Sequence, residues 1–292
     1  MVNFKDRIPY SAIVDRPKLP LPEGARMVVW TIINVEEWSN AGPMPRTVLP
    51  PPMGVPLLPD LPNWAWHEYG MRVGFWRLHE MFARQGVIPT MAVNGIVCEN
   101  YPRIAGAALD AGWEFMGHGY LQGPMHKLDD QRDAIRKTHD AIASVTGKPP
   151  VGWECPGLTQ TDETIDILAD EGVKYTADWV LDDQPTRIET ANGSMVSVPY
   201  SVETNDIPIF ALQNHQSDVM YKRTVDQFEH LYAESETITR VMAISVHPYL
   251  SGVPHRIGYL EKIYEHIKTK PDVLMWTGEQ IYEWYDSQVP AG

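Results

Sequence analysis

The stretch Arg26-Met-Val-Val-Trp-Thr-Ile-Ile-Asn-Val-Glu36-Glu37-Trp38 decides the fold that we expect for this chain. Its unbroken apolar, β-branched run is typical of a strand buried on both faces, as in parallel sheets. The run ends abruptly in two carboxylates, Glu36 and Glu37. Because parallel α/β folds collect their functional groups at the carboxyl ends of strands, these acids indicate a functional site. The alternative is that the strand simply ends in a charged loop.

Strand-like and helix-like segments alternate along most of the remaining chain. Strands are expected near residues 26–35, 87–93, 113–117, 150–153, 173–180, 195–200, 241–247 and 273–277. Segments 130–146 and 256–268 carry apolar side chains at helical spacing. About eight strands with intervening helices favour one α/β domain over residues 1–292, a parallel (β/α) barrel. An open doubly wound sheet is the alternative, weakened because no glycine-rich phosphate loop follows the first strand.

Composition restricts the class of protein. A net charge of −14, with only 24 scattered Lys and Arg residues, argues against binding to nucleic acid. No apolar run approaches the ~20 residues of a membrane span, and the first residues lack the apolar core of a secretory signal. Two cysteines, Cys98 and Cys155, cannot build a disulfide framework. We therefore expect a cytoplasmic enzyme that acts on a small molecule.

The segment 41–62 is rich in proline, so neither a helix nor a central strand can persist through it. It follows the Glu36-Glu37 pair directly and should lie over the same mouth of the barrel. A stiff lid, a subunit contact and a structurally undemanding loop are the three interpretations that the sequence leaves open.

Two histidines follow other expected strands. His118 stands between Gly117 and Gly119, which gives the ring close backbone approach and favours metal ligation or proton transfer. His247 closes an apolar strand directly before Pro248. Because neighbouring side chains point to opposite sides of an extended chain, Glu36 and Glu37 should have different tasks. We expect Glu36 to face the barrel axis.

Other polar or aromatic residues near strand ends are candidate substrate contacts. They are Glu37, Gln122, Glu154, Trp179, Asn205 and Asp206. Trp179 could form a wall of the pocket, Asp178 could orient an imidazole, and Asn205-Asp206 could bind substrate or cap a turn.

Taken in their order along the chain, these motifs resemble those of the polysaccharide deacetylase superfamily over residues 20–285. The shared features are an acidic pair after the first strand, a Gly-His turn, a Pro-Gly motif, an Asp-Trp motif and a strand-ending histidine. The chain is most similar to a cytoplasmic branch with cofactor-independent allantoinases and peptidoglycan-deacetylase-like proteins. Segments such as Glu68-Tyr-Gly70, Ala111-Gly-Trp-Glu114 and Val198-Pro-Tyr200 carry that closer similarity. The resemblance implies a distorted (β/α) barrel of about seven to eight parallel strands.

The chain departs from the metal-dependent relatives in three features. Glu36 and Glu37 stand in place of an aspartate pair, Gln122 in place of a second histidine, and Glu154 in place of an arginine. A glutamine oxygen is a poorer zinc ligand than an imidazole. If a metal binds, the resemblance implies weakly held zinc on Glu36, His118 and Gln122, unless His126 or His215 takes part. We expect no obligatory cofactor.

The resulting functional hypothesis is hydrolysis of a non-peptide carbon–nitrogen bond in a small amide, imide or ureide, either cyclic or open-chain. Glu36 would accept a proton from water, and His118 or His247 would protonate the leaving nitrogen. The alternatives are a carbohydrate or peptidoglycan N-deacetylase that uses a divalent metal, and a barrel that binds a ligand without turning it over. By analogy we expect a homo-oligomer, either a dimer or a tetramer, without nucleic-acid or membrane partners.

Overall fold

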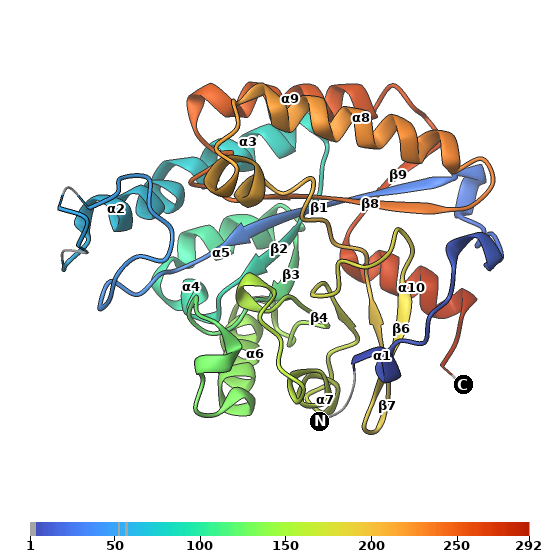
Figure 1. The fold of residues 1–292 in the computed structure, drawn as a ribbon, viewed down its shortest axis with the longest axis horizontal. Coiled ribbons are helices and arrows are strands. Elements are labelled where there is room, and N and C mark those ends of the chain that lie inside the picture. The colour runs from blue at the N-terminus through green and yellow to red at the C-terminus, as the bar shows by residue number, and fades with distance from the viewer. Residues whose placement is uncertain (1–3, 52, 56–57, 292) are drawn as a thin grey trace.

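The computed structural model describes residues 4–51, 53–55 and 58–291, which form one curved sheet surrounded by helices (Figure 1). Its strands are β1 (Met27–Val35), β2 (Thr90–Val93), β3 (Glu114–Gly117), β4 (Gly152–Trp153), β5 (Tyr175–Thr176), β6 (Thr186–Thr190), β7 (Gly193–Ser197), β8 (Arg240–Val246) and β9 (Val273–Trp276). The order is β6-β7-β5-β4-β3-β2-β1-β8, and β9 pairs with β1. Every pairing is parallel except that of β6 with β7. This architecture confirms the predicted distorted (β/α) barrel.

Strand β1 is central, and all nine of its residues are buried, as the apolar run predicts. One edge pairs with β8 over Met27–Ile33. The other edge is divided, because Met27–Trp30 pairs with β9 and Ile32–Val35 pairs with β2. Two strands therefore diverge from one edge of β1, and this divergence distorts the barrel.

Alternate side chains of β1 enter two different cores. Val28, Trp30 and Ile32 pack inside the barrel with residues of β2, β3, β5, β7 and β8. Their neighbours in the strand pack outward against the helices. Consecutive residues of an extended strand point to opposite faces. The alternation therefore directs residue 36, and not residue 37, toward the barrel axis.

Helices form the outer layer, with α8 and α9 running side by side across one face (Figure 1). The helices are α1 (Phe4–Arg7), α2 (Leu61–Tyr69), α3 (Phe75–Gln85), α4 (Gly95–Asn100), α5 (Pro102–Asp110), α6 (Gln131–Thr146), α7 (Thr164–Asp170), α8 (Asp218–Glu234), α9 (Pro254–Ile267) and α10 (Gly278–Gln288). A π-helix, Gly70–Gly74, joins α2 to α3, and a second one covers Ile207–Leu212. The predicted helices at 130–146 and 256–268 are confirmed as α6 and α9.

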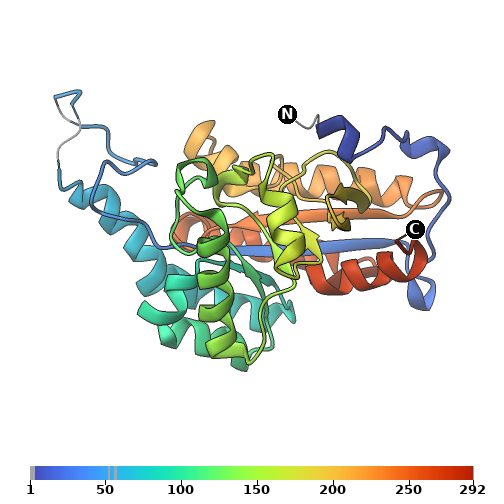
Figure 2. The ribbon, with the colours of Figure 1, turned by 90° about the horizontal axis from the view of Figure 1, so that it is seen from below.

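The proline-rich segment contributes no strand among its described residues, and only its last residues are helical, where α2 begins at Leu61. Its prolines at positions 52 and 56 lie outside the described residues. The segment projects from the body of the molecule beside α2 (Figure 2). Across the described ranges, no helix has the length and apolar character needed to cross a membrane.

Candidate active site

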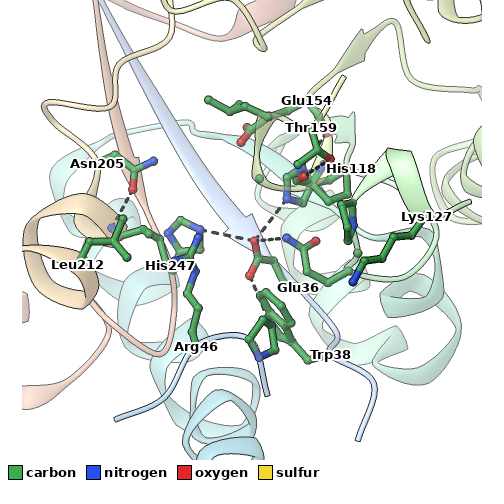
Figure 3. Close-up of a pocket in the computed structure, with 18 of the residues that line it drawn as sticks. Glu36, Trp38, Arg46, His118, Lys127, Glu154, Thr159, Asn205, Leu212 and His247 are labelled. Carbon is green, nitrogen blue, oxygen red and sulfur yellow. Dashed lines mark hydrogen bonds and ion pairs between the residues drawn. The ribbon is translucent and has the colours of Figure 1, made fainter. Parts of the chain in front are cut away.

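A cavity of about 710 Å³ opens at the carboxyl ends of the strands (Figure 3). Its walls come from the segments that follow β1, β3, β4, β7 and β8. The polar and charged side chains among its lining residues include Glu36, Arg46, His118, Gln122, Lys127, Glu154, Asn205 and His247. This volume lies within the range of small-molecule sites.

Glu36 is the point at which the polar groups of the cavity converge (Figure 3). Its Oε1 accepts a hydrogen bond from Gln122 Nε2 at 2.8 Å, while Trp38 Nε1 donates to Oε2 at 3.1 Å. His118 Nε2 lies 3.3 Å from Oε1, and His247 Nε2 lies 3.6 Å from the same oxygen. Glu36 therefore faces inward, as expected from its position in the strand.

The rings of His118 and His247 have the same arrangement. Each Nδ1 donates to a fixed acceptor, which is the Glu154 carbonyl at 2.8 Å for His118 and Asp206 Oδ1 at 2.7 Å for His247. Each Nε2 consequently faces the Glu36 carboxylate. In the protonated rings both Nε2 atoms are donors, so the two imidazoles can deliver protons to the same small volume.

These contacts displace the pKa values of all three groups. Burial by itself would raise the pKa of Glu36, but the charges and hydrogen bonds of His247 and His118 hold it well below its usual range. Burial opposes the charged form of His247, yet the Asp206 and Glu36 carboxylates raise its pKa to about 10. Burial opposes the charged form of His118 as well, but the hydrogen bonds and charges of Glu36 and Glu154 together raise its pKa. The site thus pairs an ionised carboxylate with protonated imidazoles.

The orientation of Gln122 follows from a chain of hydrogen bonds that starts at the backbone. The Glu37 N–H can only donate, so at 2.9 Å it requires Asn94 to present Oδ1. Asn94 Nδ2 then donates to Gln122 Oε1 at 2.9 Å. Only the nitrogen of the Gln122 amide is left to face Glu36. Gln122 is therefore a hydrogen-bond donor to the carboxylate.

A divalent metal does not fit this set of side chains. The oxygen of Gln122 points away from Glu36 and toward Asn94, and an amide nitrogen is not a metal ligand. No group of three or more His, Cys, Asp or Glu side chains that could hold a metal ion occurs within the described residues. His126 and His215, the possible substitutes, are exposed and do not line the cavity. In this orientation, Gln122 does not complete the conditional ligand set of Glu36, His118 and Gln122.

Three expected substrate contacts are placed elsewhere. Glu37 lies outside the cavity, where Asn100 Nδ2 donates to its two oxygens at 2.9 and 3.0 Å. Trp179 donates to Gln160 at 3.0 Å and packs against Phe4, so it forms no wall of the cavity. Both corrections have one cause, because each side chain points away from the barrel axis.

The third correction is Asp206, which is fully buried behind His247 and does not line the cavity. It takes the orienting role that the sequence suggested for Asp178. Asp178 instead accepts a hydrogen bond from the Cys155 N–H at 2.6 Å. Asn205 does line the cavity, but its amide is engaged with the Tyr200 hydroxyl and the Ile207 N–H. Glu154 lines the cavity as expected.

Sequence reasoning missed three residues that shape the site. Trp38 supports Glu36, Asn94 orients Gln122, and Arg46 lines the cavity near the His247 ring (Figure 3). Arg46 could have been found, because it is the only basic residue of the proline-rich segment. The roles of Trp38 and Asn94 depend on contacts between loops, and no spacing in the sequence signals them.

Comparisons with known proteins identify relatives of this chain. A family model described as polysaccharide deacetylase matches residues 67–176. A Schizosaccharomyces pombe protein, whose name assigns it to the polysaccharide deacetylases, is 30% identical in an alignment 243 residues long that covers 76% of this chain and 76% of that protein. The peptidoglycan deacetylase of Helicobacter pylori is 24% identical in an alignment 243 residues long that covers 72% of this chain and 82% of that enzyme.

Solved structures share the same fold. The crystal structure of Puue allantoinase has a TM-score of 0.85 at 23% identity and covers 97% of this chain and 98% of its own. A probable polysaccharide deacetylase from Pseudomonas aeruginosa PAO1 has a TM-score of 0.84 at 24% identity, with coverage of 96% and 99%. At this level of identity, the likeness establishes the architecture of the barrel.

Proposed function

Because this chain belongs to the polysaccharide deacetylase family, we propose that it hydrolyses a non-peptide carbon–nitrogen bond, in a small amide, imide or ureide. The observation that carries the proposal is the convergence of His118 Nε2 and His247 Nε2 on one buried carboxylate, that of Glu36. The cavity volume, about 710 Å³, is suited to a small molecule.

In the proposed reaction, Glu36 accepts a proton from the water that attacks the carbonyl carbon. Its lowered pKa keeps it ionised, although it also makes the carboxylate a weak base in the free site. A substrate that draws the His247 proton toward its own polar atoms weakens the charge facing Glu36. The basicity of Glu36 therefore increases when the substrate binds.

The protonated imidazoles supply the positive charge that the tetrahedral intermediate requires. His118, fixed by the Glu154 carbonyl, stabilises the oxyanion. His247, held in its charged form by Asp206, protonates the leaving nitrogen as the carbon–nitrogen bond breaks. Every step uses side chains that line the cavity, and none requires a metal.

A carbohydrate or peptidoglycan N-deacetylase is the second candidate, because the name of the Helicobacter pylori relative describes that activity. The side chains around Glu36 weigh against it, since that activity is expected to use a divalent metal. A barrel that binds its ligand without turnover is the third candidate.

A substrate panel with two neighbouring variants tests the proposal. Wild type, Glu36→Gln and Glu37→Gln are assayed on allantoin, hydantoin, succinimide and an N-acetylated sugar, with and without added zinc. We expect wild type to open at least one ring compound without zinc. Glu36→Gln should lose at least about 100-fold in kcat, since it keeps the shape and removes the base. Glu37→Gln is the matched control and should stay within a few-fold of wild type.

Other outcomes of the panel contradict the proposal in different ways. Hydrolysis of the N-acetylated sugar alone, dependent on zinc, identifies the second candidate. Full activity of Glu36→Gln on a ring compound removes Glu36 from its role as base. No turnover of any compound favours the binding protein.

A further inference from the structure

Glu154 holds an unused hydrogen-bonding group inside the cavity. Its side chain is 3% exposed, and its Oε2 has no hydrogen-bond partner among the described residues. The backbone of the residue is fixed on both sides, because its N–H donates to the Gly117 carbonyl at 2.9 Å and its carbonyl accepts from His118 Nδ1 at 2.8 Å. A buried polar atom without a partner is uncommon in folded proteins, and in a cavity it indicates a group kept for a ligand.

The position of Glu154 suits contact with a substrate that is held at Glu36. In Figure 3, Glu154 and Trp38 lie on opposite sides of Glu36. A ligand that reaches the carboxylate of Glu36 is therefore within the same enclosure as Glu154. The proposed mechanism does not use the Glu154 side chain, so it is free to select the ligand.

Four titratable groups face this carboxyl group from the surrounding segments: His118 after β3, Asp178 after β5, Tyr200 after β7 and His247 after β8. Burial raises the pKa of Glu154 to about 7; the two imidazoles and the Tyr200 hydroxyl oppose the shift, and Asp178 adds to it. Below this pH, the group is a carboxylic acid with one donor, O–H, and one acceptor, C=O. Above it, the group can only accept.

We propose that Glu154 selects the substrate by pairing its neutral carboxyl group with an N–H and the adjacent C=O of a ring amide. The inference rests on the proposed function and adds the specificity-determining residue. A ring holds the amide in the cis form, with N–H and C=O on the same side, where a carboxylic acid can contact both. An acyclic secondary amide is trans and presents the two groups on opposite sides.

Two variants at this position separate hydrogen bonding from charge. Glu154→Gln keeps one donor and one acceptor but cannot ionise, so it reproduces the proposed binding form at every pH. Glu154→Leu keeps much of the volume and removes both groups. The probes are hydantoin and its N-methyl derivatives, in which a methyl group replaces one N–H.

One of the methylated rings has its methyl group at the N–H that would contact Glu154. For wild type we expect the KM for hydantoin to be about 10-fold lower than the KM for this methylated ring, because the methylated ring loses one hydrogen bond. This KM should rise as the pH increases through about 7, where Glu154 loses its proton. Glu154→Gln should keep the preference for the N–H ring and lose the pH dependence. Glu154→Leu should lose the preference, so that its KM values for hydantoin and for the methylated ring become similar.

Two results overturn the inference while the proposed function stands. They are a preference for the N–H ring that persists in Glu154→Leu, and a KM that rises through pH 7 to the same extent in Glu154→Gln as in wild type. Calorimetric titration of hydantoin into Glu36→Gln and into the double variant Glu36→Gln/Glu154→Leu tests binding without turnover. Equal affinities in the two proteins contradict the inference, even if no ring is hydrolysed.

Discussion

Asp206 determines the charge of His247. Its Oδ1 accepts from His247 Nδ1 at 2.7 Å, while Oδ2 accepts from the His247 N–H at 2.8 Å and from Ser251 Oγ at 2.6 Å. This fully buried carboxylate accepts three hydrogen bonds, and its charge raises the pKa of His247. The pair therefore supplies a fixed proton donor at one wall of the cavity.

The substitution Asp206→Asn should shift the alkaline limit of activity. The pKa of His247 is raised from 6.5 to about 10, so the kcat of wild type should fall only as the pH approaches 10. Without the carboxylate charge, this pKa drops and the decline in kcat begins at a lower pH. The pH profile of kcat at saturating substrate measures the shift, because the titration of Glu154 acts on KM, and exposed Asp226→Asn in α8 is the control. Superimposable alkaline limbs in Asp206→Asn and wild type contradict this role.

The same pair has a predictable effect on stability. Because the pKa of His247 is higher in the folded state, its protonation stabilises the fold fully below the unfolded pKa of about 6.5. That contribution is lost as the pH rises through about 10.

Glu36, His118 and His247 could be identified from the sequence, because each is among the first polar residues after an apolar strand. The supporting residues could not. Asp206 reaches His247 from a segment far away in the chain, and Asn94 acts only through the conformation of two loops.

At the scale of elements, the π-helix Gly70–Gly74 fixes the segment that follows β8. Its Gly74 contacts the residue after His247 so closely that an added Cβ would lie 2.0 Å from the Pro248 carbonyl oxygen. Gly252 approaches Gly74 from the same segment, where a Cβ would lie 2.6 Å from the Gly74 oxygen. Such contacts between backbones are possible only for glycine.

Gly74→Ala should therefore destabilise the protein and impair the site, because the Pro248 carbonyl must move and His247 is the preceding residue. Overpacking of this kind costs about 1–3 kcal/mol. The control is Gly106→Ala in α5, where an added Cβ has no neighbour within 4 Å and the helix gains roughly 0.5–1 kcal/mol. Urea unfolding and kcat give the two readouts. Equal stability of the two variants contradicts the close contact.

The success of the strand predictions followed the burial of each strand. Strand β1 was predicted almost to the residue, since every side chain is buried and the run is continuous. Strand β6 was missed, because Thr186–Thr190 is largely polar and lies at the antiparallel edge of the sheet. The expected strand at 173–180 is only Tyr175–Thr176 in the structure. Asp178 instead accepts a hydrogen bond from the Cys155 N–H in the segment that follows β4.

At the scale of the whole molecule, the proline-rich segment and the start of α2 project from the body (Figure 2) and carry exposed apolar side chains. The exposed large apolar residues there are Val48, Leu49, Met53, Val55, Leu58 and Leu61. The apolar patches of soluble monomers are small, so a larger patch indicates a partner. Of the three interpretations of the segment, a subunit contact is therefore the one that we propose, with a second copy of this chain as the partner.

Light scattering coupled to gel filtration tests this proposal. Wild type should have a mass of at least twice the 33.1 kDa of one chain. The double substitution Val48→Ser/Leu49→Ser should shift it toward a single chain, because it removes apolar surface from the contact. Val14→Ser is the control, since Val14 is even more exposed than Val48 and Leu49 but lies near the N-terminus. A wild-type mass of 33.1 kDa contradicts the proposal.

The divided edge of β1 also has a consequence for biosynthesis. When the ribosome has completed β2, only one half of one edge of β1 is paired, since β8 and β9 come from the last quarter of the chain. The longest strand of the protein thus keeps unpaired backbone hydrogen-bonding groups while most of the chain is still being made. Exposed strand edges favour aggregation, and pairings between distant segments form slowly. We expect the yield of folded protein to depend on chaperones and on temperature more than its final stability does.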